Sequence, residues 1–202
     1  ARPRRRHNAP PGAGGGLVTL SGQSATTATN LPGTANFQGH LYFNGADFAT
    51  INGSAQVVAP TYAGAGNFQN AAGALVATVH NKLTGSSTNA AATVSSLVTN
   101  SQTLTLSGNL IVSTGGILQS GGTATIQSNS GTARLIQGGV AATNVAIRVD
   151  QSGDILNLGT ATNPVNISTT TTGGFTKNGN GTLVIFGTNA QTGATTINEG
   201  TV

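Results

Sequence analysis

The sequence predicts an all-β protein: a parallel β-helix, or solenoid, that carries a flexible basic arm at its N-terminus. Three observations lead to this fold class. From Leu17 onward, short apolar runs alternate with small polar residues and show no helical period. Turn pairs such as Asn44-Gly45 and Gly121-Gly122 separate these runs. In the second half of the chain, apolar positions recur about every 20 residues, as stacked β-coils would require.

The first element, residues 1–16, is an arm rich in Arg, Pro and Gly that cannot bury a core. It holds four of the eight basic residues, while the other four balance the four acidic residues, so the body is formally neutral. A basic arm on a neutral body does not predict a nucleic-acid partner. The arm either contacts an anionic surface, such as cell-surface polysaccharide, or is an inert linker. The residues that would make this contact are Arg2, Arg4, Arg5 and Arg6.

Residues 17–101 form an irregular β region that we expect to be the start or the cap of the solenoid. Strand-like runs of varied spacing lie at residues 40–53, 56–58, 73–79 and 94–99. A solenoid needs its first coil shielded, because the open end of a stack exposes apolar side chains and unpaired backbone.

Residues 102–202 are expected to form regular β-helix coils, because two interleaved series of apolar positions have nearly constant spacing, close to that of stacked coils. The first series runs through Leu106, Ile126, Ile147, Ile167 and Ile185. The second runs through Val112, Leu135, Leu156, Phe175 and Ile197. Stacking on these registers would place Leu, Ile and Val inside and Thr, Ser and Asn outside.

The threonine pairs Thr103/Thr105 and Thr123/Thr125 are 20 residues apart, the interval expected for one coil, which would put them on one face. Flat Thr-x-Thr arrays resemble those of ice-binding β-helices. The array does not continue cleanly into the next coil, so a Thr ladder that serves β-propensity is the favoured interpretation.

The segment Gly173-Gly-Phe-Thr-Lys-Asn-Gly-Asn-Gly-Thr-Leu-Val-Ile-Phe-Gly, with Thr195-Thr-Ile-Asn-Glu-Gly-Thr-Val, contains three short β-runs separated by Gly and Asn turns. It closely resembles the autotransporter-associated β-strand repeat, also called the passenger-associated transport repeat, of secreted bacterial β-helical proteins. Residues 47–118 resemble regions that precede such repeats. The resemblance implies an extracellular protein, located at the bacterial cell surface.

Candidate catalytic and metal-binding residues are few. The chain has no Cys, and His7, His40 and His80 lack metal-ligand spacing. Neither a nucleophile elbow nor a phosphate loop is present, so the sequence predicts no catalytic residue, no metal and no cofactor. Asp150 and Asp154 are the only close carboxylate pair, and Arg148 shares a strand face with Asp150, which favours a solvated ion pair.

The expected function is therefore a non-enzymatic structural or adhesive surface protein. One alternative is a carbohydrate-active β-helix enzyme, a polysaccharide lyase or hydrolase, which would need Asp47 brought near Asp150 and Asp154. Another is a passenger fragment that binds a surface or a carbohydrate, which would need a row of exposed aromatic rings.

The C-terminus suggests partners. Asn198-Glu-Gly-Thr-Val202 stops within the repeat and carries no capping charge beyond Glu199. An uncapped β-edge templates further strand addition. We expect Thr201 and Val202 to contact either further coils of a longer chain or another copy, and head-to-tail stacking of copies would build a filament.

Overall fold

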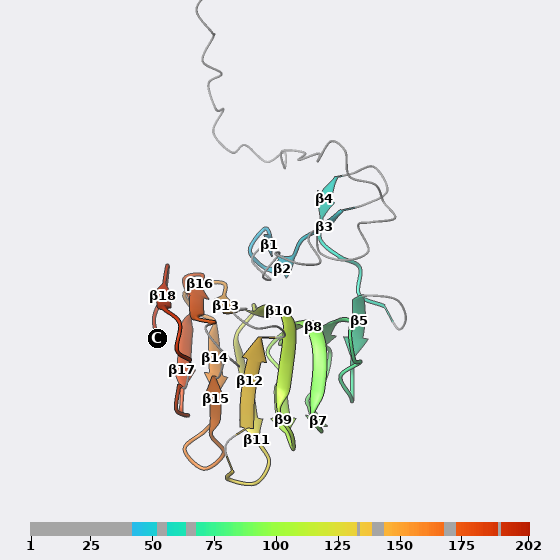
Figure 1. Cartoon of the computed structure of the whole chain (residues 1–202). Helices are drawn as coiled ribbons and strands as arrows, with labels where there is room; N and C mark the ends of the chain where they lie inside the picture. Colours follow the sequence, from blue (N-terminus) through green and yellow to red (C-terminus); the bar gives the residue numbers. More distant parts are fainter. Residues whose placement is uncertain are drawn as a thin grey trace, which may run out of the picture.

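The computed structural model describes residues 42–51, 56–63, 68–132, 134–138, 144–167, 173–189 and 191–202. This described part of the chain is all-β and contains no helix (Figure 1). Its strands pair in parallel except in two short hairpins, which confirms the predicted solenoid class. The predicted arm with Arg2, Arg4, Arg5 and Arg6 lies outside the described residues.

Two parallel sheets and two hairpins make up the structure. The nine-stranded main sheet consists of β5 (Phe68–Ala71), β6 (His80–Leu83), β8 (Ala92–Val98), β10 (Leu110–Gln119), β12 (Arg134–Gly138), β13 (Val145–Val149), β15 (Val165–Ile167), β16 (Phe175–Asn178) and β18 (Thr195–Ile197). The five-stranded second sheet consists of β7 (Ser87–Asn89), β9 (Thr103–Leu106), β11 (Thr123–Ser128), β14 (Ile155–Leu158) and β17 (Thr182–Ile185). The hairpins are β1 (Tyr42–Phe43) with β2 (Asp47–Phe48), and β3 (Thr50–Ile51) with β4 (Val57–Val58).

The long strand β10 gives the main sheet two sides. Its first residues, from Leu110 to Val112, pair with β12, and its last residues, from Gly116 to Gln119, pair with β13. The register against β8 shifts between these two halves. One coil therefore uses a single strand with a shifted register where the next coil uses two separate strands. With the second sheet, the coils from β8 to β17 have three sides.

Successive coils differ in length, so the prediction that residues at a constant spacing lie above one another is wrong. One column of the main sheet runs through His80, Ser96, Gly116, Ala146, Thr176 and Thr196. The coil that joins Gly116 to Ala146 is nearly twice as long as the coil that joins His80 to Ser96.

The predicted first series aligned Ile126 with Ile147, but Ile126 pairs with Leu104 and Leu158 in the other sheet. The reason is physical: only the strands must stack in register, whereas the corners between them tolerate insertions. A constant interval in the sequence therefore does not identify the residues that lie above one another.

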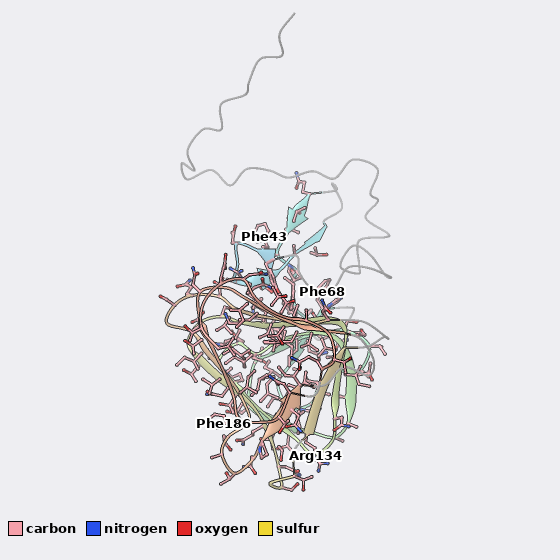
Figure 2. All side chains as sticks on the ribbon, turned by 60° about the vertical axis from the view of Figure 1, so that its left-hand side comes forward. Phe43, Phe68, Arg134 and Phe186 are labelled. Atoms are coloured by element: carbon pink, nitrogen blue, oxygen red, sulfur yellow. The ribbon has the colours of Figure 1, made fainter. Side chains whose placement is uncertain are left out.

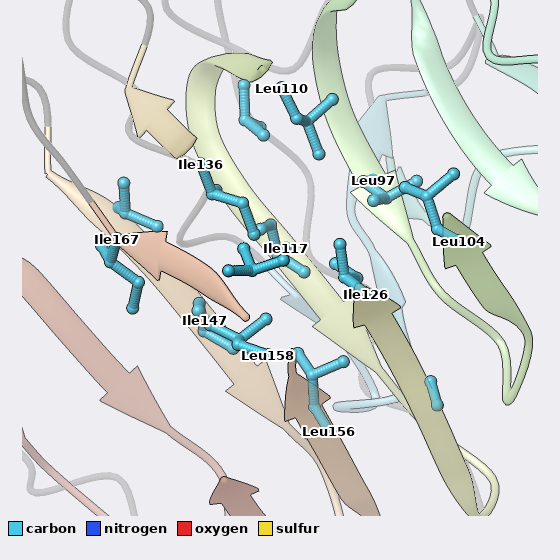
Figure 3. Packing of buried hydrophobic residues seen from close by; sticks show 14 of the residues in the cluster. Leu97, Leu104, Leu110, Ile117, Ile126, Ile136, Ile147, Leu156, Leu158 and Ile167 are labelled. Carbon is cyan, nitrogen blue, oxygen red and sulfur yellow. The ribbon is translucent and has the colours of Figure 1, made fainter. Parts of the chain in front are cut away.

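The core is one continuous cluster of apolar side chains between the sheets (Figure 3). Leu104, Ile126 and Leu158 stack directly across three coils and are fully buried. Each such side chain contributes roughly 1.5–3 kcal/mol by leaving water. The expectation that Leu, Ile and Val fill the inside is confirmed.

The outer face of the second sheet carries a short mixed polar ladder. Thr103 pairs with Thr125, whose Oγ1 accepts a 3.4 Å hydrogen bond from Asn157 Nδ2. Gln127 Nε2 donates to Thr105 Oγ1 at 3.4 Å. Because Thr103 pairs with Thr125 and Thr105 with Gln127, the predicted alignment of Thr103/Thr105 with Thr123/Thr125 is offset by two residues. A flat threonine array of the ice-binding type does not form on these strands.

Two buried asparagines close the N-terminal end of the stack. Asn81 lies below Leu97 on an inward column, and its side chain bonds Val76 N, Val76 O and Val79 O at 2.8–3.0 Å. Asn89 Oδ1 accepts from Leu75 N at 2.7 Å. These bonds hold residues 72–79, the N-terminal cap, across the end of the core. The predicted division at residues 16 and 101 stays a prediction.

We expect Asn81→Ala to loosen the N-terminal cap, because it removes the partners that the Asn81 side chain supplies to the backbone N–H and carbonyl of Val76. Such groups, when left without partners, cost about 1–3 kcal/mol each. Hydrogen exchange at Val76 should accelerate, and the urea midpoint of unfolding should fall. Thr93→Ala, on an exposed position of β8, is the matched control and should change neither. Unaltered exchange in Asn81→Ala would contradict the assignment of a cap.

Candidate functional surfaces

A flap, formed by residues 42–51 and 56–63, lies beside the main sheet near the carboxyl ends of its strands, and its hairpin β3–β4 stands away from the sheets (Figure 1). Phe48 is fully buried against Val98 and Leu118, which point outward from β8 and β10. Tyr42 and Tyr62 pack around this second, smaller core. The flap therefore shields apolar side chains that the solenoid by itself would expose.

One end of the flap is fastened by an ion pair and a phenol. Lys82 Nζ lies 3.3 Å from Asp47 Oδ2 and 5.3 Å from the centre of the Tyr62 ring. Tyr62 Oη donates to Asp47 Oδ1 at 3.2 Å. Burial, together with the charge and the hydrogen bond of Asp47, raises the pKa of Tyr62, so the phenol stays protonated and remains a donor.

The other end is fastened by Arg148. Its Nη2 lies 2.7 Å from Asp150 Oδ1, its Nε donates to Gly45 O at 3.1 Å, and its Cζ lies 5.1 Å from the centre of the Tyr42 ring. Burial raises the pKa of Tyr42, while the charge of Arg148 opposes that change. The predicted Arg148–Asp150 pair is confirmed, but it is not solvated: the Asp150 side chain is 7% exposed. The flap covers it.

Each described carboxylate has a partner within the fold. Asp154 Oδ1 accepts from Gly122 N at 2.6 Å, and its Oδ2 accepts from Gln151 N at 3.1 Å. Glu199 Oε2 accepts from Gly179 N at 3.1 Å. In the part of the chain that the structure describes, no three His, Cys, Asp or Glu residues gather where they could hold a metal ion.

His80 and the aromatic residues serve packing. His80 is 2% exposed, stacks on Phe68 with a centroid distance of 4.6 Å, and shares a 2.8 Å hydrogen bond with Ser96 Oγ. Burial lowers the pKa of His80 to about 4, so the ring is neutral near pH 7. Among the described aromatic residues, Phe186 alone is largely exposed, and Figure 2 shows it far from Phe43 and Phe68. The described chain presents no row of exposed rings. His7 and His40 lie outside it.

The last coil contains a buried ammonium that the sequence analysis missed. Lys177 lies on the inward column above Ile147 and is 0% exposed. Its Nζ donates to the carbonyls of Asn178, Gly179 and Glu199 at 2.8, 2.6 and 3.3 Å. Burial, followed by the charge of Arg148, lowers the pKa of Lys177 to about 8, and Glu199 opposes this shift. Alternation along β16, with Phe175 facing inward, was the signal that could have placed Lys177 inside.

Of the predicted contact residues Thr201 and Val202, Thr201 extends the second sheet. Thr201 forms a parallel bridge to Thr182, and its carbonyl accepts from Leu183 N at 2.9 Å. Val202 is 50% exposed, and Ile197 on β18 is 52% exposed. Thr201 is therefore held by the coil beneath it, whereas the side chains of Val202 and Ile197 face solvent.

Comparison with known proteins identifies the C-terminal coils. Residues 175–202 match the protein-family model described as Passenger-associated-transport-repeat, which confirms the resemblance predicted for residues 173–202. No curated protein and no solved structure matches the chain. The repeat indicates a secreted protein of the autotransporter passenger type, so the coarse prediction of a secreted or cell-surface bacterial protein holds. No helix long and apolar enough to span a membrane occurs in the described residues.

The stability of the protein should fall as the pH drops from about 6.5 to about 4, because His80 binds a proton more readily in the unfolded chain. A folded pKa of about 4 against 6.5 corresponds to a loss of roughly 3 kcal/mol once both states are protonated. Urea unfolding at pH 7.5, 5.5 and 4 measures this. His80→Gln keeps a hydrogen-bonding side chain without titration and should flatten the profile. If the free energy of unfolding falls equally steeply with decreasing pH in the wild type and in His80→Gln, this role of His80 is ruled out.

Gly200→Ala should destabilise the last coil. Gly200 has φ of +73°, and an added Cβ would collide with the carbonyls of Gly179 and Gly181 and approach Lys177 Nζ to 2.8 Å. The left-handed backbone alone costs a non-glycine residue about 1–2 kcal/mol. Faster hydrogen exchange in β16 and β18 is the expected readout. Gly153→Ala is the control, since nothing lies within 4 Å of its added Cβ, and it should be neutral. Comparable effects of both substitutions would refute the argument.

Proposed function

We propose that this chain is a non-enzymatic structural rod, secreted and displayed at the bacterial cell surface, where it serves a structural or adhesive role. The proposal rests chiefly on how the charged side chains are used. Asp47, Asp150, Asp154 and Glu199 each bind a cation or a backbone N–H inside the fold. Catalytic carboxylates of a lyase or hydrolase need to face a substrate instead.

The positions of Asp47 and Asp150 also support this proposal. Asp47 pairs with Lys82 and Asp150 with Arg148, and these two cations are three strands apart in the main sheet. At about 4.8 Å per strand, that separation is roughly 14 Å. Asp154 is committed to two backbone N–H groups at a corner. The three carboxylates act as separate structural anchors.

Asp154→Asn distinguishes this proposal from the carbohydrate-active enzyme. We expect neither the wild-type chain nor the variant to release unsaturated or reducing ends from a panel of acidic and neutral polysaccharides. The variant should instead lose about 1–3 kcal/mol of stability, because it weakens charge-assisted bonds to Gly122 N and Gln151 N. Thr123→Ala, an exposed change on the neighbouring coil, should be neutral. Turnover by the wild type that Asp154→Asn abolishes would overturn the proposal.

A finer part of the proposal concerns copies of the chain as partners. Head-to-tail stacking needs an accepting N-terminal end, but the N-terminal cap and the asparagines that hold it, Asn81 and Asn89, occupy that end. The edge of β18 that faces away from β16 carries the half-exposed Ile197. We therefore expect two copies of the 202-residue chain to pair through this edge, in a closed two-fold contact and not in a growing filament.

Sedimentation of the purified chain over a hundredfold range of concentration tests this pairing. A monomer–dimer equilibrium that Ile197→Lys abolishes is the expected result, because a charge on an edge strand blocks pairing. Thr93→Lys, on an exposed position of β8 near the opposite end of the stack, should leave it unchanged. Filaments, or a monomer at every concentration, would refute the two-fold contact.

Binding of anionic polysaccharide that is lost when Arg2, Arg4, Arg5 and Arg6 become Ser would support an adhesive arm.

A further inference from the structure

One peptide group in the last coil is polarised from both sides. The peptide that joins Asn178 to Gly179 has its carbonyl oxygen 2.8 Å from the ammonium of Lys177. Its N–H donates to the carboxylate of Glu199 at 3.1 Å. A cation on the oxygen withdraws electrons from the amide, and a carboxylate on the N–H can accept the proton. Together they make Gly179 N more acidic, and so more easily converted to a nucleophile, than an ordinary amide nitrogen.

The side chain of the same asparagine is polarised too. Asn198 Nδ2 donates to Asn178 Oδ1 at 2.8 Å, which increases the electrophilic character of Asn178 Cγ. The neighbouring residue Gly179 has φ of +77° and no Cβ that would hinder approach. The nucleophile and the activated electrophile thus lie in two consecutive residues, and the base, Glu199, contacts the nucleophile from the neighbouring coil.

The next Asn-Gly pair lacks this arrangement. Gly181 N donates to the backbone carbonyl of Val149 at 3.0 Å, and Asn180 N donates to Asp150 O at 2.9 Å. A carbonyl oxygen is a far weaker base than a carboxylate. Asn180 is nevertheless the more exposed of the two asparagines, so solvent access alone would favour reaction there.

We propose that Asn178 is a self-modification site, at which the fold promotes closure of Asn178-Gly179 to a succinimide. Gly179 N attacks Asn178 Cγ, forming the N–Cγ bond, while Glu199 takes the amide proton. The Cγ–Nδ2 bond then breaks, and Nδ2 leaves as ammonia with the proton returned by Glu199. Water opens the ring at either carbonyl, which yields aspartate or isoaspartate at position 178.

The modification would weaken the contact between the last two coils. Asn178 and Asn198 form a side-chain amide pair between β16 and the turn after β18. Aspartate at position 178 places a second carboxylate close to Glu199, and isoaspartate lengthens the backbone at a tight corner. Either product should make residues 195–202 easier to detach from the stack.

The experiment compares two asparagines within the same protein, so it needs no variant. The folded 202-residue chain and the chain in 8 M urea are incubated at pH 7.4 and 37 °C, where Lys177 is still mostly an ammonium. Peptide mapping by mass spectrometry follows the gain of one mass unit at each residue. In the folded chain, Asn178 should react at least about tenfold faster than Asn180, a modest effect for a positioned general base. In urea the two rates should be similar.

The Glu199→Gln variant provides a second test. It retains an acceptor for Gly179 N but removes the base, so the rate at Asn178 should fall about tenfold while Asn180 is unchanged. Hydrogen exchange in β16 and β18 verifies that the variant is folded. If it is not folded, the rates at Asn178 and Asn180 in the folded wild-type chain test the proposal. Equal rates at Asn178 and Asn180 in the folded chain would overturn the proposal, as would an undiminished rate in a folded Glu199→Gln variant.

Discussion

Parallel pairing of each coil with the next is the constraint on which the rest of this structure depends. Because the strands are stacked in register, a residue that faces inward in one coil must lie above an inward residue of the coil before it. Leu104, Ile126 and Leu158 satisfy this condition with apolar side chains. Lys177 satisfies it with a polar group, and that is tolerated because three backbone carbonyls surround its Nζ.

At the corners of the coils, buried polar side chains form the hydrogen bonds to backbone groups that a neighbouring strand would form within a sheet. Gln119 is fully buried: its Oε1 accepts from Thr99 Oγ1 at 2.6 Å and from Ser101 N at 3.1 Å, and its Nε2 donates to Gly122 O at 2.8 Å. Asp154 then takes the N–H of Gly122. Such side chains satisfy backbone groups that a turn leaves unpaired. Coils of different length can therefore follow one another without breaking the core.

Few charges are present, and the described ones mostly fasten parts of the fold to each other. Lys82 holds one end of the flap through Asp47 and the Tyr62 ring, and Arg148 holds the other through Gly45 O and the Tyr42 ring. Glu199 and Lys177 act on the same peptide group in the last coil. A chain with 6% charged residues thus uses its ion pairs for internal contacts. This is consistent with a rod whose exposed surface is made largely of small polar residues.

The sequence by itself determined the class of the protein: β-type alternation, turn glycines and the repeat at residues 175–202 are local patterns, and each can be read within a few residues. It also placed Asp150 beside Arg148, since two residues apart on a strand means one face. Only the tertiary structure decided the register of the coils, which depends on the lengths of corners that no local pattern specifies. It also decided that Lys177 is buried and that the flap reaches Arg148 from Gly45, 103 residues away in the chain. Contacts of that kind arise from packing between distant segments, and for this reason the candidate sites proved less predictable than the fold.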